Sequence, residues 1–206
     1  MTLIRCILLV QFATTLAPSQ LAQSSKPPSV TKQPEAMVQS LYREVVARHP
    51  VGILEGADIK IFSPYLSKVL LHKIDLAVAC STDWGRQHPD PNEKPGFAWL
   101  ESGLFSGDDE RTSPRAFHID EARQERNGSF RVYVRLTWGS AASPWIWHVA
   151  AIVVQENGHF VVDDVIYLKD KDRDDESSLS EYLSSGCDGA RWVGYSERRN
   201  DPNRQR

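Results

Sequence analysis

Two Asn-Gly pairs, Asn127-Gly128 and Asn157-Gly158, constrain the fold more strongly than any other feature of this 206-residue sequence. The runs that flank them have apolar residues at alternate positions and comprise residues 116–125, 130–138, 145–155 and 160–168. An Asn-Gly pair between such runs is the strongest short-range signal for a β-hairpin, because both residues tolerate positive φ. Two hairpins predict at least four antiparallel strands.

A two-residue loop at each Asn-Gly pair would set the register of the strands. In the first hairpin, Phe117 then faces Trp138 on an apolar side, and Asp120 faces Arg135 on a polar side that also carries Tyr133. The first hairpin is therefore predicted to be amphipathic. The second hairpin is apolar on both sides and so needs cover on both sides. Helices supply one cover, and a dimer partner, or residues 97–105 with the C-terminal segment, would supply the other.

Helical periodicity dominates the first half of the chain. Apolar residues recur at three- and four-residue spacing over 37–46, which predicts an amphipathic helix. A second helix is predicted to begin at Ser63-Pro64, with Ser63 as its N-cap, and to end near Cys80. A short helix is expected over 178–184. The predicted fold class is α+β, with N-terminal helices packed on a curved, cone-like antiparallel sheet.

The N-terminus has the pattern of a signal peptide. Arg5 precedes an apolar stretch that is too short to span a bilayer, and small residues follow it. Cleavage is open between Ser19, Ala22 and Ser24. We therefore predict export to the periplasm or the medium. The predicted organisation is a signal peptide (1–24), a flexible segment (25–33), a single α+β domain (34–195) and a disordered tail (196–206).

Removal of the leader would take Cys6 with it and leave Cys80 and Cys187. An even pair of cysteines in an oxidising compartment predicts a disulfide between them. The alternative is two unpaired, buried thiols. A disulfide that closes so long a loop contributes about 4–5 kcal/mol in the chain-entropy model.

Charge argues against several classes of partner. The chain carries 24 Lys and Arg and 27 Asp and Glu, mixed along its length, which disfavours a nucleic-acid or anionic-membrane surface. No later apolar run is long enough to span a membrane. Asp170, Asp172, Asp174 and Glu181 have the spacing of a calcium loop, but Asp175 occupies the glycine position. We predict a solvated loop there, and no metal or cofactor.

The order of these elements resembles the nuclear-transport-factor-2-like superfamily, in its uncharacterised exported bacterial branch. The resemblance rests on the helix over 37–46, the helix start Ser63-Pro64-Tyr65-Leu66 and the closing strand over 160–167. It implies a pocket between the helices and the sheet. Members include isomerases and dehydratases with Asp, His or Tyr in that pocket, and also proteins that bind without catalysis.

Three titratable residues are candidates for chemistry. Asp164 shares the predicted face of Trp147, and a buried acid in an apolar cleft is a candidate general base; the alternative is a structural acid. His148 lies opposite Tyr167 and on the face of Asp163, so it is a candidate for proton transfer or a packing residue. The residues predicted to line the pocket are Trp147, Tyr133, Arg135 and Trp138.

The favoured function is non-catalytic binding of a small ligand or a protein partner by an exported single-domain protein, with a homodimer through the sheet as a corollary. The motifs of serine hydrolases, P-loop proteins and zinc proteases are missing from the sequence. The alternatives are a small isomerase, dehydratase or hydrolase that uses a pocket Asp or His, and a protective protein of the immunity or inhibitor type.

Overall fold

The computed structural model describes residues 30–107, 113–169 and 175–195. The predicted signal peptide, most of the flexible segment, the acidic run over 170–174 and the predicted tail lie outside the described residues. Within the described part of the chain, no helix is both long and apolar enough to cross a membrane.

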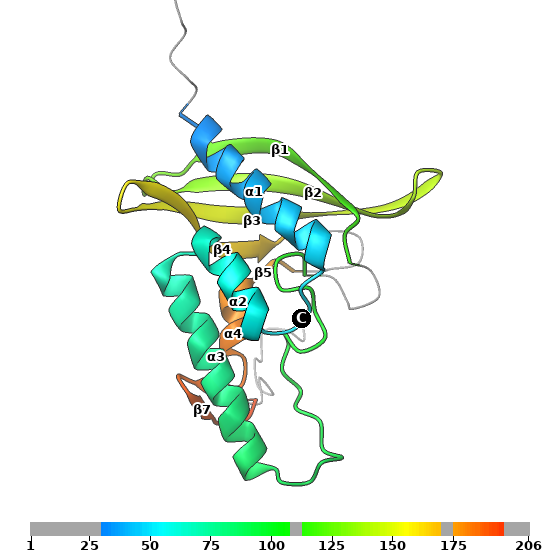
Figure 1. The fold of residues 1–206 in the computed structure, drawn as a ribbon, viewed down its shortest axis with the longest axis vertical. Coiled ribbons are helices and arrows are strands. Elements are labelled where there is room, and N and C mark those ends of the chain that lie inside the picture. The colour runs from blue at the N-terminus through cyan, green and yellow to red at the C-terminus, as the bar shows by residue number, and fades with distance from the viewer. Residues whose placement is uncertain (1–29, 108–112, 170–174, 196–206) are drawn as a thin grey trace, which may run out of the picture.

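A five-stranded antiparallel sheet, with its strands in chain order, lies in the upper part of the molecule as drawn in Figure 1. Its strands are β1 (Ala116–Gln124), β2 (Phe130–Ser140), β3 (Ser143–Glu156), β4 (His159–Tyr167) and β5 (Ser177–Ser178). Together with the N-terminal helices, this sheet confirms the predicted α+β class.

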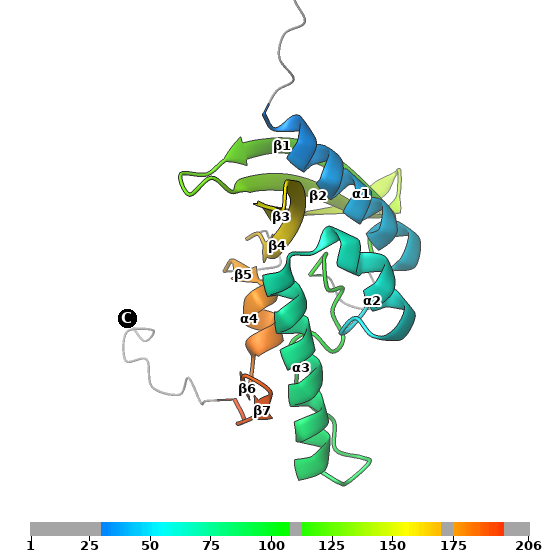
Figure 2. The same cartoon turned by 60° about the vertical axis from the view of Figure 1, so that its left-hand side comes forward.

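The helical elements lie in two parts of the molecule, one on the sheet and one beyond it. The helical elements are α1 (Lys32–Arg48), α2 (Gly56–Phe62), the 3₁₀ turn η1 (Ser63–Tyr65), α3 (Lys68–Gln87) and α4 (Leu179–Ser184). Helix α1 lies across one face of the sheet and contacts β1, β2 and β4, whereas α3 runs away from the sheet (Figure 1). Helix α4 and the two-stranded ribbon of β6 (Cys187–Asp188) and β7 (Arg191–Trp192) lie along α3 (Figure 2). We call the face of the sheet under α1 the inner face, and the opposite face the outer face.

The long helix starts later than predicted. Its N-cap is Ser67, whose hydroxyl accepts a hydrogen bond from the Leu70 N–H at 2.9 Å, and Ser63 lies in η1 instead. The reason is that Leu66 is extended and bridges Val162 of β4, so the chain cannot be helical between the two serines. Leu70, Ile74, Ala77 and Cys80 of this helix are buried, whereas Val69 is 52% exposed.

The two hairpins differ in their loops. Asn157 and Gly158 both have positive φ and form the predicted two-residue loop between Glu156 and His159. The prediction for Asn127-Gly128 is wrong by one residue, because Glu125 pairs with Ser129 around a three-residue loop. Only its last residue, Gly128, has positive φ, as expected for a type I turn closed by a glycine bulge.

A β-bulge in each hairpin changes which side chains share a face. Asp120 is the extra residue in β1, and Asp163 is the extra residue in β4. Beyond Asp163 the alternation inverts, so Tyr167 pairs with Val149 and joins the inner face. Asp164 pairs with Ile152 on the outer face, which corrects the prediction that it shares the face of Trp147.

Candidate functional site

The predicted pocket between the helices and the sheet is filled by the chain itself. Residues 97–107 enter this space, and Phe97, Trp99, Leu104 and Phe105 are all buried there. Three aromatic donors from three elements hold consecutive carbonyls of this segment. The donors are Tyr42 Oη to Phe105 O at 2.8 Å, Tyr167 Oη to Leu104 O at 2.7 Å and Trp147 Nε1 to Ser106 O at 2.9 Å.

The four predicted pocket residues are therefore not brought together. Trp147 is a buried core residue that holds the filling segment. Trp138 is partly buried and packs edge-on against Trp145. Tyr133 and Arg135 point to the outer face, away from the core. This space is packed with side chains of residues 97–107, and the four predicted residues do not share one face of the sheet.

Both candidate aspartates have structural partners. Asp163 accepts a hydrogen bond from the Ser67 hydroxyl at 2.6 Å, which ties the start of α3 to β4. Asp164 Oδ1 accepts from the backbone N–H groups of Val165 and Ser180 at 2.8 and 3.0 Å. Carboxylates committed to such bonds anchor loops and helix starts, which is the structural alternative considered for them.

His148 lies on the outer face, where it pairs with Arg135 across β2 and β3 rather than facing Tyr167. Its side chain is 45% exposed, and its Nε2 lies 3.9 Å from Asp120 Oδ2. Asp120 also lies 3.3 Å from Arg135 Nη2 and 3.8 Å from His118 Nε2. Asp120 and Arg135 thus form the predicted ion pair without being register partners, because Arg135 pairs with His118, and Phe117 pairs with Leu136 rather than with the predicted Trp138. His148 belongs to this exposed charged cluster.

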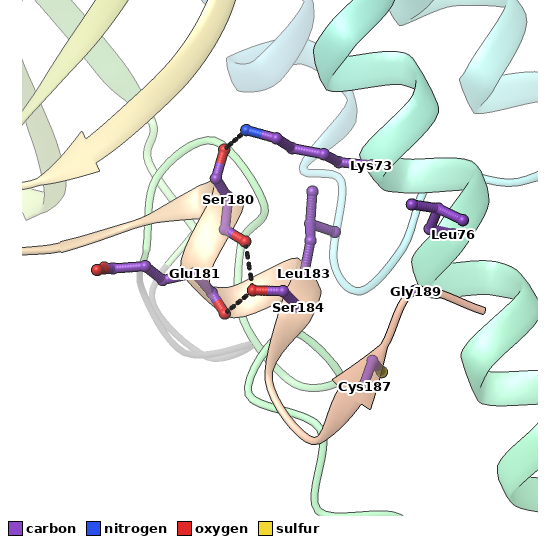
Figure 3. A pocket seen from close by; sticks show the side chains of 8 residues that line it. All are labelled: Lys73, Leu76, Ser180, Glu181, Leu183, Ser184, Cys187 and Gly189. Carbon is purple, nitrogen blue, oxygen red and sulfur yellow. Dashed lines mark hydrogen bonds between the residues drawn. The ribbon is translucent and has the colours of Figure 1, made fainter. Parts of the chain in front are cut away.

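A hollow with a mainly apolar wall lies between α3 and α4 (Figure 3). We call it the α3–α4 cleft; it has a volume of about 330 Å³ and is lined by Lys73, Leu76, Ser180, Glu181, Leu183, Ser184, Cys187 and Gly189. This volume lies at the lower end of the range for small-molecule sites. Leu76 and Leu183 form the apolar wall, and Lys73 brings the cleft its one cation.

Lys73 crosses from α3 to α4 and donates a hydrogen bond from Nζ to Ser180 Oγ at 2.7 Å (Figure 3). A serine beside a lysine can also be a nucleophile with its base. Here the two nearest backbone N–H groups are already used: that of Ser180 by Asp164, and that of Glu181 by the Ser178 hydroxyl. Neither of these N–H groups is therefore free to bind an oxyanion, and the arrangement favours binding over acyl transfer.

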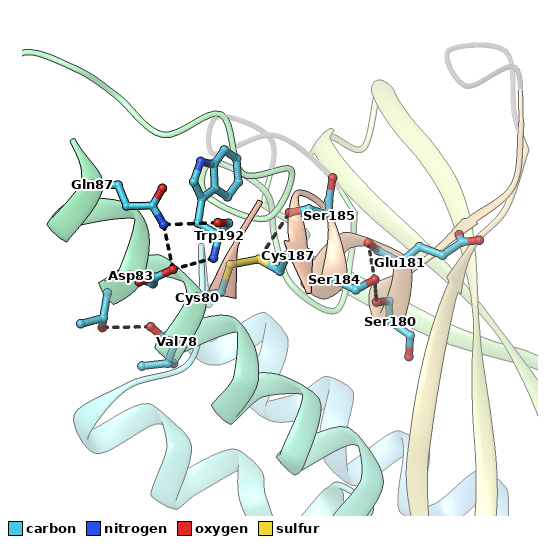
Figure 4. The surroundings of a disulfide bond; sticks show 11 residues. Val78, Cys80, Asp83, Gln87, Ser180, Glu181, Ser184, Ser185, Cys187 and Trp192 are labelled. Carbon is cyan, nitrogen blue, oxygen red and sulfur yellow. Dashed lines mark hydrogen bonds between the residues drawn. A yellow bond between two sulfur atoms is a disulfide. The ribbon is translucent and has the colours of Figure 1, made fainter. Parts of the chain in front are cut away.

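A disulfide closes one end of the cleft. Cys80 of α3 and Cys187 of β6 are joined, as predicted, and are separated by 107 residues (Figure 4). Beside it, Asp83 accepts hydrogen bonds from the Trp192 backbone N–H at 2.8 Å and from Gln87 Nε2 at 3.0 Å. The Trp192 N–H, and then the neighbouring Arg86, hold the pKa of Asp83 below its usual range. Covalent and polar contacts thus fix β6–β7 to α3.

Lys73 and Ser180 were not predicted from the sequence, although a signal was present. Lys73 precedes Cys80 by seven residues, which is two helical turns on one face, and Ser180 precedes Cys187 by the same number. The disulfide joins α3 to Cys187, which follows the end of α4 by three residues, and so brings α3 and α4 close to each other. The predicted pairing of Cys80 with Cys187 therefore implied a contact between residues near 73 and residues near 180.

We compared the chain with protein-family models, with curated proteins and with solved structures, and found no match in any of the three. The resemblance to the nuclear-transport-factor-2-like superfamily therefore stays a prediction based on the order of elements.

Proposed function

We propose that this protein is exported and binds a small molecule, without catalysis, in the α3–α4 cleft. The observation that supports this most directly is the cleft itself, in which an apolar wall of Leu76 and Leu183 lies next to the polar groups of Lys73 and Ser180. Ligand sites commonly combine an apolar lining with a few converging polar groups.

The position of the cleft also supports binding. It lies between elements that are distant in sequence and are fixed to each other at both ends. The Cys80–Cys187 disulfide joins them at one end, and the Lys73–Ser180 hydrogen bond joins them at the other. A site whose walls are already fixed loses little conformational entropy when a ligand enters.

A neutral fluorophore tests this proposal without assuming a charge on the ligand. N-phenyl-1-naphthylamine should gain fluorescence with the wild-type protein. Ser184→Trp should abolish the gain, because Ser184 is an exposed cleft residue and the indole would fill the space. Ser40→Trp on α1 is the matched control, since each serine hydroxyl donates to the carbonyl four residues earlier. Equal fluorescence in Ser184→Trp and wild type would contradict the proposal.

Export is supported by the Cys80–Cys187 disulfide, because such bonds persist in oxidising compartments. Mass spectrometry of the protein recovered from the periplasm or medium should give an N-terminus between residues 20 and 25. Full-length chain confined to the cytoplasm would contradict export.

A second candidate function is association with a second copy of this chain through the outer face of β1–β3. Each arginine of this face has an acidic neighbour in its own chain: Arg123 with Glu121, Arg131 with Glu125, and Arg135 with Asp120. A face with balanced charges of both signs can complement itself across a two-fold axis. Tyr133, the arginines and the exposed Ile146 also match the composition of protein interfaces.

Sedimentation velocity at high protein concentration tests the second candidate. The wild-type chain should sediment as a dimer, and Ile146→Lys should sediment as a monomer. A wild-type monomer at the highest concentration would contradict it and would leave the cleft proposal unaffected.

A further inference from the structure

We infer that the ligand of the α3–α4 cleft is an amphipathic monoanion, of the class of small alkyl or aryl carboxylates; this inference rests on the proposed binding function. It follows from the way in which the charge of Lys73 is held, from the neighbouring carboxylates and from the apolar wall.

The Lys73 ammonium is held by a neutral group. Ser180 Oγ accepts one of its three N–H donors, and no carboxylate of the described residues forms an ion pair with it. Lys73 is also partly buried, so part of its hydration is lost. A cation in such a position gains more from an anionic partner than a fully exposed lysine does.

The carboxylates of this region are committed elsewhere. Glu181 lines the cleft, but its carboxylate accepts the Ser178 backbone N–H at 2.8 Å and points away from Lys73 (Figure 3). Asp164 is held by the N–H groups of Val165 and Ser180. Neither side chain can turn toward Lys73 without losing hydrogen bonds at the start of α4. An external anion would meet no such competition.

The rest of the cleft wall determines the chemistry of the uncharged part of the ligand. Leu76, Leu183 and the sulfur of Cys187 present apolar surface, and Gly189 adds no side chain. One cation balances one negative charge, so a dianion such as a phosphate monoester would retain an uncompensated charge against this wall. A single carboxylate on a short apolar body fits both the cation and the wall.

Isothermal titration calorimetry with three probes of equal chain length tests the ligand class. Sodium octanoate should bind the wild-type protein about tenfold or more tightly than 1-octanol, and octylammonium should bind more weakly than both. Lys73→Gln should reduce octanoate affinity to that of 1-octanol and leave 1-octanol unchanged. Lys60→Gln on α2, an exposed lysine outside the cleft, should change neither.

Two further variants distinguish a wrong ligand class from a wrong binding site. Ser180→Ala removes the same Lys73 hydrogen bond but keeps the charge, so octanoate affinity should fall less than threefold; a fall equal to that of Lys73→Gln would show a structural effect and overturn the inference. Equal binding of octanoate and 1-octanol, abolished by Ser184→Trp, would overturn the ligand class and keep the cleft as the site. Binding that Ser184→Trp leaves unchanged would overturn the proposed function as well.

Discussion

The molecule consists of two regions that are held together in different ways. The first, which we call the sheet body, contains α1, β1–β4 and residues 97–107; the second, which we call the C-terminal layer, contains the second half of α3, α4, β6 and β7. In the sheet body, aromatic side chains fill the interior, and three of them bind consecutive carbonyls. In the C-terminal layer, a disulfide and a buried aspartate hold elements that leave a cleft between them.

This difference shows where such a fold can carry a ligand site. A region that is closed by packing has used its interior and leaves no room for a ligand. The C-terminal layer buries Leu179 and Leu183 in the core, and covalent and polar links add to this packing. Those links allow the layer to keep a cleft without losing its position. We therefore expect the two regions to respond differently to the same kind of change.

Removal of the disulfide should have the largest effect. Cys80→Ala with Cys187→Ala should lower the free energy of unfolding by about 4–5 kcal/mol, because the bond closes a loop of roughly one hundred residues. Urea unfolding measures this loss. Native-state hydrogen exchange of the variant should be accelerated, relative to wild type, more in α4, β6 and β7 than in β2 and β3. A loss below about 1 kcal/mol, or faster exchange spread evenly over both regions, would contradict the comparison.

Substitutions at two glycines allow the rigidity of the two regions to be compared directly. Gly107 and Gly186 both have positive φ, and an added Cβ would lie 2.5 Å from the Tyr167 ring and 2.3 Å from the Trp192 ring, respectively. Tyr167 is fully buried and hydrogen-bonded, whereas Trp192 is only partly buried and can shift. Gly107→Ala should therefore cost about 3 kcal/mol and Gly186→Ala about 1 kcal/mol.

Thermal or urea unfolding of both glycine variants provides the measurement. Gly158→Ala is the control for φ alone, since its Cβ would meet nothing within 4 Å. Equal losses for Gly107→Ala and Gly186→Ala would show that the two regions are equally rigid, contrary to our account.

The hydrogen bonds to residues 104–106 should have an intermediate effect. Tyr42→Phe removes the donor to the Phe105 carbonyl and leaves that buried oxygen without this partner, at a cost of about 1–3 kcal/mol. Tyr65→Phe is the matched control, because the Tyr65 hydroxyl has no hydrogen bond to the described part of the chain. Chemical denaturation should separate the two variants; an equal, small loss in both would show that the bond to Phe105 is not stabilising.

Asp83 should have the smallest effect, because its partner Arg86 is largely exposed. The folded-state pKa of Asp83 is lower than its ordinary value of about 3.8. Its contribution is therefore present above that value and is lost as the pH falls through the folded-state pKa. Asp83→Asn should lower stability at pH 7, and the difference from wild type should shrink below pH 4. A pH-independent difference would contradict this assignment.

The sequence predicts the elements better than the faces they present. The hairpins, the first helix and the Cys80–Cys187 pair follow from local patterns and cysteine number. The bulges at Asp120 and Asp163 do not, because one extra residue inverts alternation without interrupting the strand. The inversion after Asp163 moved Asp164 and Tyr167 to the faces opposite to those predicted, which made an anchoring acid resemble a catalytic one.

The candidate site was harder to predict than the fold. Whether a cone holds a ligand or its own loop depends on long-range packing, and the carbonyls of residues 104–106 are bound by side chains from α1, β3 and β4. The cleft depends on a contact between Lys73 and Ser180 that the disulfide creates. Because Lys73 and Ser180 are far apart in sequence, that contact can be predicted only when the disulfide is used as a geometric constraint.

Amide chemical-shift mapping during a titration with sodium octanoate tests the central claim, which is that the C-terminal layer carries the binding site. The account predicts saturable shifts centred on Lys73, Leu76 and residues 180–189, with the sheet body unchanged. Shifts centred on residues 97–107 or on the outer face of β1–β3, or no saturable shifts at all, would contradict it.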